Sequence, residues 1–274
     1  MLILPVFGIQ FKTLFKMGKK KKLEDSISRV EINGKRYYKV IEKGIEVGTF
    51  PSVTSILGST KDKSGLDNWR NKIGDEAADK IGKDSTDRGT VMHRLCELYL
   101  NIPIGIKSED KLQEVLEIAR HDEEIRKFDN RAIIVGGQLF YNFYNTGMFE
   151  KITKVVSQEQ FLWSKAAGGY AGTVDNFSLL DDGSYKVIDF KTAKKAKNEE
   201  WIEGYKLQVS AYCIAIWERL GIKPDGAEIW ISNEKDRFPQ CFQLSLNDIR
   251  NNFKVFTERA KLFHELHSVK NVNI

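Results

Sequence analysis

Residues 168–192 read GGYAGTVDNFSLLDDGSYKVIDFKT, and this stretch carries the strongest structural signal in the chain. Both halves are rich in residues that favour strands, and the Asp-Asp-Gly between them is a turn signal, so the stretch predicts a β-hairpin. If the loop has three residues centred on Asp182, paired residue numbers sum to 364. Asp175 then faces Asp189 with Cβ atoms about 4.5–5.5 Å apart, and Lys191 shares their face. A two-residue turn would instead place the two aspartates on opposite faces.

Such an arrangement suits a metal ion. Two carboxylates this close repel each other unless a cation lies between them, and Mg²⁺ is commonly held by one or two carboxylates together with water and substrate phosphate. A lysine beside the metal can orient or deprotonate an attacking water, or offset charge on a scissile phosphate. The alternative is a surface hairpin with solvated charges. Against it, Val187, Ile188 and Phe190 make the second strand otherwise apolar, and strands of that kind are usually covered on both faces.

Further motifs along the chain match one enzyme family in order. Gly172-x-x-Asp175, then Ile188-Asp189-Phe190-Lys191-Thr192 and Gln208-x-x-x-Tyr212, resemble the RecB-type branch of the PD-(D/E)XK nucleases. Upstream, the sequence Arg-Gly-Thr-Val-Met-His at residues 88–93 matches the Arg-Gly-Thr-x-x-His helix of that branch. Residues 50–57 resemble the Pro-Ser-Val-Thr segment of phage exonucleases and of the mitochondrial genome maintenance exonuclease. Val174 stands where the family name would put proline, a departure that is common in this branch.

The resemblance implies both a fold and an activity. The fold would be α/β, a restriction-endonuclease-like core with a mixed central sheet flanked by helices, plus a helical insertion before the sheet. The activity would be that of a metal-dependent DNA exonuclease, which hydrolyses phosphodiester bonds from DNA ends in recombination, replication or repair. The alternatives are a non-catalytic nucleic-acid-binding protein that retains the fold, and a structure-specific endonuclease. The implied cofactors are one or two Mg²⁺ or Mn²⁺ ions, and the implied partner is DNA with a free end.

The resemblance also assigns metal ligands. Asp175, Asp189 and the histidine that matches the family position, His93, would hold the ions, and the backbone carbonyl of Phe190 would complete the coordination. Without the resemblance, a lone histidine is more often structural or solvated. An imidazole ligand makes Mn²⁺ as suitable as Mg²⁺. Glu159 aligns loosely with a family acid on the first strand, and we expect a buried polar role for it.

Gln208 and Tyr212 are four residues apart on an expected helix, so they share a face. By resemblance they help to fix Lys191 and the DNA strand near the metal; read alone, they would be a polar pair at a helix boundary. Further DNA contacts are expected from residues that match the family motifs or follow the catalytic strand: Arg88, Ser52, Thr54, Lys194 and Lys195. A solvated charge run is the alternative for the two lysines, which have Lys197 beside them, and an ordinary surface arginine is the alternative for Arg88. Trp69, Phe140 and Tyr144 are either base-stacking residues or core.

Composition fits this view without requiring it. The 274 residues are 41% hydrophobic and 30% charged, as in soluble globular proteins, and the formal net charge of +5 suits a polyanionic partner. We expect no membrane association and a location in the cytoplasm of a bacterial or phage-infected cell. The three cysteines, Cys96, Cys213 and Cys241, cannot supply a four-cysteine iron–sulfur cluster, and we expect them to be reduced and buried.

Residues 1–28 form a basic extension, and residues 29–274 are expected to form the nuclease domain. Six lysines precede the first acid, Glu24, and the apolar stretch before them is too short and broken to span a bilayer. The extension is a basic arm, a weak targeting segment or the result of a start at Met17. A β-ribbon is expected at residues 29–41 and a helical cap at about 66–147, with helices at 66–82, 86–100, 109–128 and 131–147.

Overall fold

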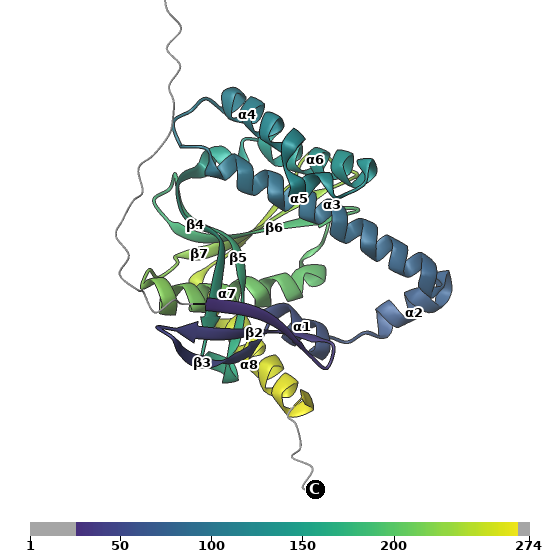
Figure 1. Cartoon of the computed structure of the whole chain (residues 1–274), viewed down its shortest axis with the longest axis vertical. Coiled ribbons are helices and arrows are strands. Elements are labelled where there is room, and N and C mark those ends of the chain that lie inside the picture. Colours follow the sequence, from purple (N-terminus) through teal and green to yellow (C-terminus); the bar gives the residue numbers. More distant parts are fainter. Residues whose placement is uncertain (1–25, 268–274) are drawn as a thin grey trace, which may run out of the picture.

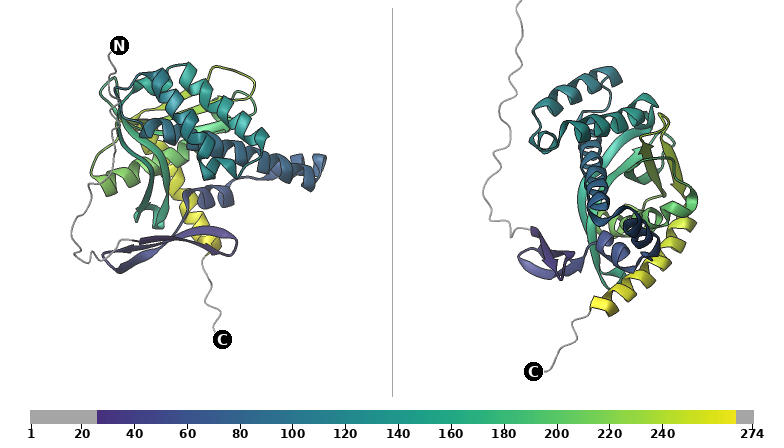
Figure 2. Two further views of the ribbon diagram at one scale, coloured as in Figure 1. Left: turned by 45° about the horizontal axis from the view of Figure 1, so that its top comes forward. Right: turned by 90° about the vertical axis from the view of Figure 1, so that its right-hand side faces the viewer.

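The computed structural model of the chain describes residues 26–267, so most of the basic extension lies outside the described residues. The first described elements form a three-stranded antiparallel sheet of β1 (Ser26–Ile32), β2 (Lys35–Glu42) and β3 (Ile45–Pro51). Asn33 and Gly34 turn the first hairpin with φ values of 51° and 69°, the left-handed conformation that an Asn-Gly type I′ turn requires. The expected ribbon is therefore present, with a third strand added. It contacts β5 and is separate from the central sheet (Figure 2).

The central sheet has the strand order β4-β5-β6-β7-β8, as expected for a mixed sheet. Its strands are β4 (Ile152–Ser164), β5 (Tyr170–Leu180), β6 (Tyr185–Ala193), β7 (Gly226–Asn233) and β8 (Gln240–Leu244). The β6–β7 pair is parallel and the other pairs are antiparallel. Parallel neighbours need a crossover connection, and α7 (Glu203–Leu220) supplies it.

Helices cover both faces of this sheet (Figure 1). Alternation along β6 sends Val187 to one face, into the apolar cluster formed with α1 (Val53–Thr60), α7 and α8 (Leu246–His267). Ile188 and Phe190 point to the other face, where they pack with α3 (Asp75–Asn101) and α6 (Asn130–Asn145). β6 is therefore buried on both faces. The charged side chains of Asp189 and Lys191 on this strand need partners inside the protein, because an unpaired buried charge is costly.

The helical insertion lies between β3 and β4, as expected, but its internal breaks differ from the prediction. Helix α2 (Ser64–Ile73) ends at Gly74, whose φ of 84° lies in a region that glycine tolerates, and α3 then runs unbroken to Asn101. The expected helices at 66–82 and 86–100 were therefore divided at the wrong place. The remaining helices of the insertion are α4 (Ser108–His121) and α5 (Glu123–Arg126), which separate at the capping residue Asp122, followed by α6.

Only part of the insertion stands away from the sheet. α2 buries none of its residues, and α2 and the first turns of α3 project outward as an arm (Figure 1). The end of α3 and the buried side of α6 pack on the sheet face instead, and Phe140 is 2% exposed in that core. Phe140 is therefore a core residue, whereas Trp69 on the arm is exposed. Cys96 and Cys213 are buried, but Cys241 is exposed, contrary to the expectation. Within residues 26–267, no helix is long and apolar enough to cross a membrane.

Candidate metal centre

The centre forms where β5 and β6 separate. Their pairing runs from Leu179–Tyr185 to Asn176–Ile188, and each pair sums to 364, which confirms the three-residue loop. Beyond Asn176–Ile188, β5 continues along β4 while β6 continues along β7. Asp175 and Asp189 are the first residues past this fork.

A backbone hydrogen bond ties the two sides of the fork together. The Phe190 N–H on β6 donates to Oδ2 of Asp175 on β5 at 2.9 Å. This contact fixes the Asp175 carboxylate beside the strand that carries Asp189 and Lys191, so the hairpin positions all three polar groups.

Glu159 joins the centre from β4. Its neighbours Gln158 and Gln160 pair with Asn176 and Val174, so Glu159 lies opposite Asp175. Its φ of 44° is unusual for a residue other than glycine, and strain of this kind is concentrated at functional sites. Glu159, Asp175 and Asp189 therefore form a row of acids across three neighbouring strands.

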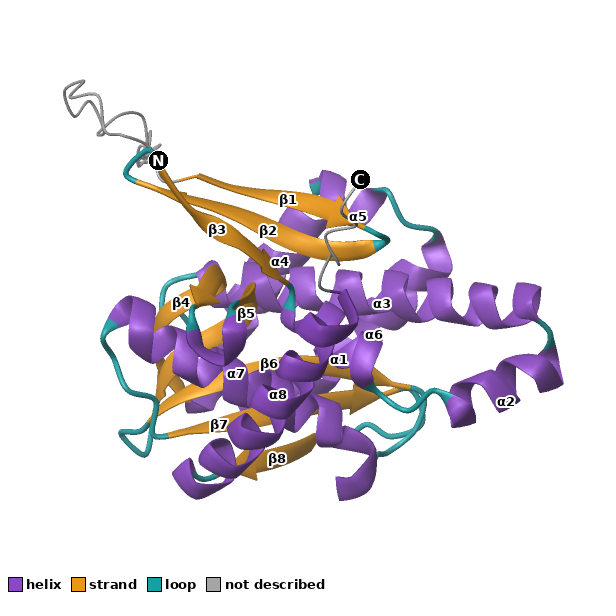
Figure 3. Cartoon of the chain, turned by 90° about the horizontal axis from the view of Figure 1, so that it is seen from below, coloured by secondary structure: helices purple, strands orange, loops and turns teal. Residues whose placement is uncertain are grey.

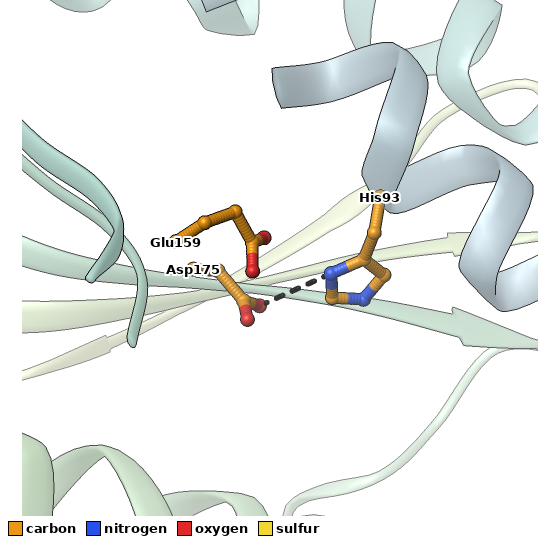
Figure 4. Close-up of side chains that lie close together, drawn as sticks. All are labelled: His93, Glu159 and Asp175. Atoms are coloured by element: carbon orange, nitrogen blue, oxygen red, sulfur yellow. Dashed lines mark ion pairs between the residues drawn. The ribbon is translucent and has the colours of Figure 1, made fainter. Parts of the chain in front are cut away.

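α3 brings an imidazole nitrogen to the row. Nδ1 of His93 lies 3.5 Å from Oδ2 of Asp175, and the ligand atoms of His93, Glu159 and Asp175 all lie within 4.8 Å of one another (Figure 4). The helix is held there by close packing on α6, because a Cβ added at Gly136 would lie 2.6 Å from Cβ of Val91. A hydrogen bond with the Phe190 backbone also acts on the His93 ring, where it opposes the lowering of the pKa by burial, and the role of the Phe190 carbonyl as a ligand stays a prediction.

Burial and mutual repulsion shape the charges of these groups. The Glu159 residue as a whole is exposed, but its carboxylate points at Asp175 and His93, and burial together with the charge of Asp175 raises its pKa to about 8. Burial and, more weakly, Asp175 raise the pKa of Asp189 to about 7, although Lys191 acts in the opposite direction. Burial lowers the pKa of His93 more than Asp175 raises it, which leaves the imidazole neutral, as a metal ligand must be.

Asp189 has unmet bonding capacity. The residue is 1% exposed. Its Oδ2 forms an ion pair with Nζ of Lys191 at 2.5 Å, but no described residue donates a hydrogen bond to its Oδ1. Buried carboxylate oxygens without donors are rare in folded proteins and are costly unless a cation approaches them. Asp189 stands next to the group of three rather than within its 4.8 Å radius. The donor set of oxygens and one imidazole fits a divalent cation such as Mg²⁺ or Mn²⁺.

α7 supports the lysine side of the centre. Gln208 Nε2 lies 3.3 Å from the Tyr212 hydroxyl, so the two share a face as predicted. The Tyr212 ring is buried against β5, where a Cβ at Gly172 would lie 2.8 Å from its hydroxyl. The ring of Tyr205 lies 5.3 Å below Nζ of Lys191. Tyr205 was not predicted from the sequence. Its position three residues before Gln208 on the same helix is the signal that could have indicated it, because residues three apart share a helix face.

The residues expected to contact DNA are dispersed around this centre. Ser52 is 2% exposed, and its hydroxyl accepts a hydrogen bond from the Ser55 N–H as the cap of α1, so it does not face solvent. Thr54 is exposed beside it. Arg88 forms an ion pair with Glu234 at 3.2 Å. Lys194 and Lys195 are exposed after the end of β6. DNA contacts by these residues stay predictions, and Ser52 would need to leave its cap.

Comparison with known families agrees with this geometry. The family model of the PD-(D/E)XK nuclease superfamily matches residues 64–269, which include every side chain of the centre. The chain belongs to the PD-(D/E)XK nuclease superfamily. Membership makes the protein a nuclease, a class of enzyme that acts on nucleic acid and uses divalent metal ions.

Other comparisons add little to this PD-(D/E)XK assignment. A solved structure described as "Crystal structure of SSO0001" is 14% identical and covers 66% of this chain and 74% of that chain, with a TM-score of 0.34. A similarity this weak carries no argument about function. No curated protein matches the sequence.

Proposed function

We propose that this protein is a divalent-metal-dependent deoxyribonuclease that cuts DNA from its ends. The observation that carries the proposal is the convergence of His93, Glu159 and Asp175 at the fork. The ion pair of buried Asp189 with Lys191 lies beside them, and Oδ1 of Asp189 has no donor among the described residues. The preference for an exonuclease comes from the sequence motifs shared with phage and mitochondrial exonucleases.

Each group has a distinct task in this proposal. His93, Glu159, Asp175 and Asp189 would hold the cation, with the carbonyl of Phe190 available as a further ligand. When bound, the metal would supply Lewis acidity toward the phosphodiester and neutralise part of its charge. Lys191 extends from the same strand as Asp189 and forms an ion pair with it, and its ammonium would orient a water molecule or offset charge on the phosphate.

The residues of α7 serve as positioning groups. Tyr205 and Tyr212 flank the Lys191 and Asp189 side of the centre, and Gln208 is hydrogen-bonded to Tyr212. Their packing restricts the directions in which the Lys191 side chain can extend. Such pre-organisation favours catalysis because the charged groups need not rearrange during reaction.

Cleavage of labelled DNA tests the proposal. We expect a chelator to abolish cleavage and Mg²⁺ or Mn²⁺ to restore it, on linear DNA but not on covalently closed circular single strands. Labels at the 5′ and 3′ ends of single- and double-stranded substrates give the polarity. Efficient cutting of closed circles would refute end dependence, and a protein that binds DNA but never cuts it would be a binding protein that retains the fold.

A further inference from the structure

One stripe of side chains leads from solvent to the candidate metal centre. It starts in the short helix η3 (Glu199–Ile202), continues into α7, and consists of Trp201, Tyr205, Gln208 and Tyr212. The intervals of four, three and four residues place these side chains on one side of a helix. Exposure falls from 52% at Trp201 to 3% at Tyr212.

The outer half of the stripe lines a cleft of about 590 Å³. The cleft lies among α1, the start of α7 and α8, which lie side by side on the same face of the sheet (Figure 3). Three cations and two acids line it: Lys61, Lys197, Arg259, Glu200 and Glu203. The lining therefore has a formal charge of three minus two, or +1, which the neighbouring Lys195 increases.

Two ammonium groups lie over the Trp201 ring, and hydrogen bonds fix the backbone that carries it. Nζ of Lys195 and Nζ of Lys197 lie 5.2 and 5.8 Å from its centroid. The backbone of Lys197 is fixed by Gln240, which accepts from its N–H at 2.7 Å and donates to its carbonyl at 2.8 Å. The Asn198 side chain accepts from the Trp201 N–H at 3.0 Å and so sets the start of η3.

Proteins that bind unpaired nucleotides commonly use a large aromatic ring exposed in a positively charged cleft. Bases stack on such rings whatever their identity, and nearby lysines attract the phosphates. Bases inside a duplex are already covered on both faces, so an exposed ring selects for unpaired ones. The same cleft reaches Tyr205 and Gln208, which adjoin Lys191 and Tyr212.

We infer that Trp201 is a stacking platform for an unpaired base of the substrate strand, with Lys195 and Lys197 holding the adjacent phosphates. The ligand is single-stranded DNA, or the unwound end of a duplex, on its way to the metal centre. The inference rests on the proposed function for the identity of the ligand as DNA. It adds that the strand enters along α7 in single-stranded form.

Binding measured in the presence of a chelator tests the platform without cleavage. We expect Trp201→Ala to weaken binding of a short single-stranded oligonucleotide by about 5- to 150-fold. Trp201→Phe should restore most of this loss because it keeps an aromatic face. The matched control is Trp217→Ala, since Trp217 is also 52% exposed and has Lys223 Nζ 5.8 Å from its ring, but lies outside the cleft. It should bind like the wild type.

An abasic oligonucleotide of the same length separates stacking from charge. Wild type and Trp201→Ala should bind it with the same affinity, because it has no base to stack. Removal of Lys195 and Lys197 should weaken both oligonucleotides and reduce the slope of log K against log salt by about 0.7 per lysine. Lys223→Ala should leave that slope unchanged.

Several outcomes would overturn the inference: equal binding of the normal oligonucleotide by wild type and Trp201→Ala, equal losses on the normal and abasic oligonucleotides, or a Trp201→Ala loss confined to blunt duplex. Each of these leaves metal-dependent cleavage by the wild type untouched. Conversely, a Trp201-dependent preference for single strands in a protein that never cuts DNA would refute the proposed nuclease activity and leave the platform standing.

Discussion

Two buried acids on neighbouring strands of the sheet each face a lysine, yet their surroundings differ. Glu228 on β7 lies with Lys186, and Asp189 on β6 lies with Lys191. Both acids are almost fully buried, with exposures of 2% and 1%. Similar residues in one sheet therefore provide an internal comparison between a structural ion pair and the ion pair of the proposed catalytic site.

Glu228 has all the donors that a buried carboxylate needs. It accepts hydrogen bonds from Lys186 at 2.9 Å and from the Trp230 indole at 2.8 Å, with Gln243 at 3.3 Å. Burial alone would raise its pKa, but the hydrogen bonds outweigh burial and hold the pKa below its ordinary value. Such a group is stable as an anion and has no capacity left for a ligand.

Asp189 has Lys191 as its ion-pair partner, but its Oδ1 has no donor among the described residues, and it faces the like charge of Asp175. Its pKa is raised rather than lowered. The contrast teaches that burial and a lysine partner do not by themselves mark an active site. The distinguishing feature is bonding capacity left unmet, which a bound cation would satisfy.

The largest expected effect is on the rate of DNA cleavage, and it should separate the lysines of the two ion pairs. Lys191→Ala should lower the rate of DNA cleavage by at least about 100-fold, because it removes the ammonium beside the metal centre. Lys186→Ala, on the same strand, should cleave at nearly the wild-type rate per folded molecule. Full activity in purified Lys191→Ala, on both single- and double-stranded DNA, would refute the assignment.

The free energy of unfolding should depend more on the Glu228 pair than on the Asp189 pair, the opposite of what we expect for cleavage. Glu228→Ala strands the Lys186 ammonium and the Trp230 N–H in the interior, and we expect it to lower the free energy of unfolding by about 3–5 kcal/mol. Asp189→Ala should lower it by less in the presence of a chelator, because Asp189 loses one partner, Lys191, where Glu228 loses several, and Asp189 is repelled by Asp175. Urea denaturation measures both values. Equal losses would mean that the two pairs are alike.

The pH dependence of the stability of the metal-free protein should also distinguish Glu228 from Asp189. The pKa of Glu228 is lower in the folded state, so its contribution is present above its ordinary value of 4.5 and is lost as pH falls. The pKa of Asp189 is raised from 3.8 to about 7, so the folded state holds the proton longer and stability falls as pH rises through this range.

Urea midpoints across this pH range check both signs. Asp189→Asn should flatten the fall on the neutral side, while Glu228→Gln should flatten the fall on the acid side. Glu159, whose pKa is raised to about 8, contributes with the same sign as Asp189 and would leave part of the neutral fall in place. An unchanged neutral slope in Asp189→Asn would show that this carboxyl titrates normally.

Much of the fold and of the hairpin could be predicted from the sequence because the signals are local. The Asp-Asp-Gly turn determines a register that holds to Asn176–Ile188, and a four-residue spacing places Gln208 beside Tyr212. The mixed sheet and the helical insertion also agree with the expectation. These features depend on strand alternation and helical period, which sequence expresses directly.

The remaining features depend on departures from those periods. Two register shifts in β4 and the positive φ of Glu159 bring that acid opposite Asp175, and neither leaves a sign in the residue pattern. The pairing of β5 with β6 ends at Asn176–Ile188, whereas the predicted hairpin would have continued to pair Asp175 with Asp189. The sequence did not single out Trp201, because an aromatic residue at helical spacing is more often part of a core. Its position in the cleft distinguishes it.

Calorimetric titration with Mn²⁺, combined with thermal melting, tests the shared metal centre most directly. Wild type should bind Mn²⁺ and gain about 2.7 kcal/mol of stability at a hundredfold excess over the dissociation constant. Burial and, beside it, the charge of Asp175 raise the pKa values of Glu159 and Asp189. Asp175→Asn removes that charge, so its metal-free form should melt at or above the metal-free wild type. It should bind little Mn²⁺ and cut no DNA, whereas Glu228→Gln should bind Mn²⁺ normally. A wild type whose melting ignores millimolar Mn²⁺, beside an Asp175→Asn protein that still cuts DNA, would contradict the account.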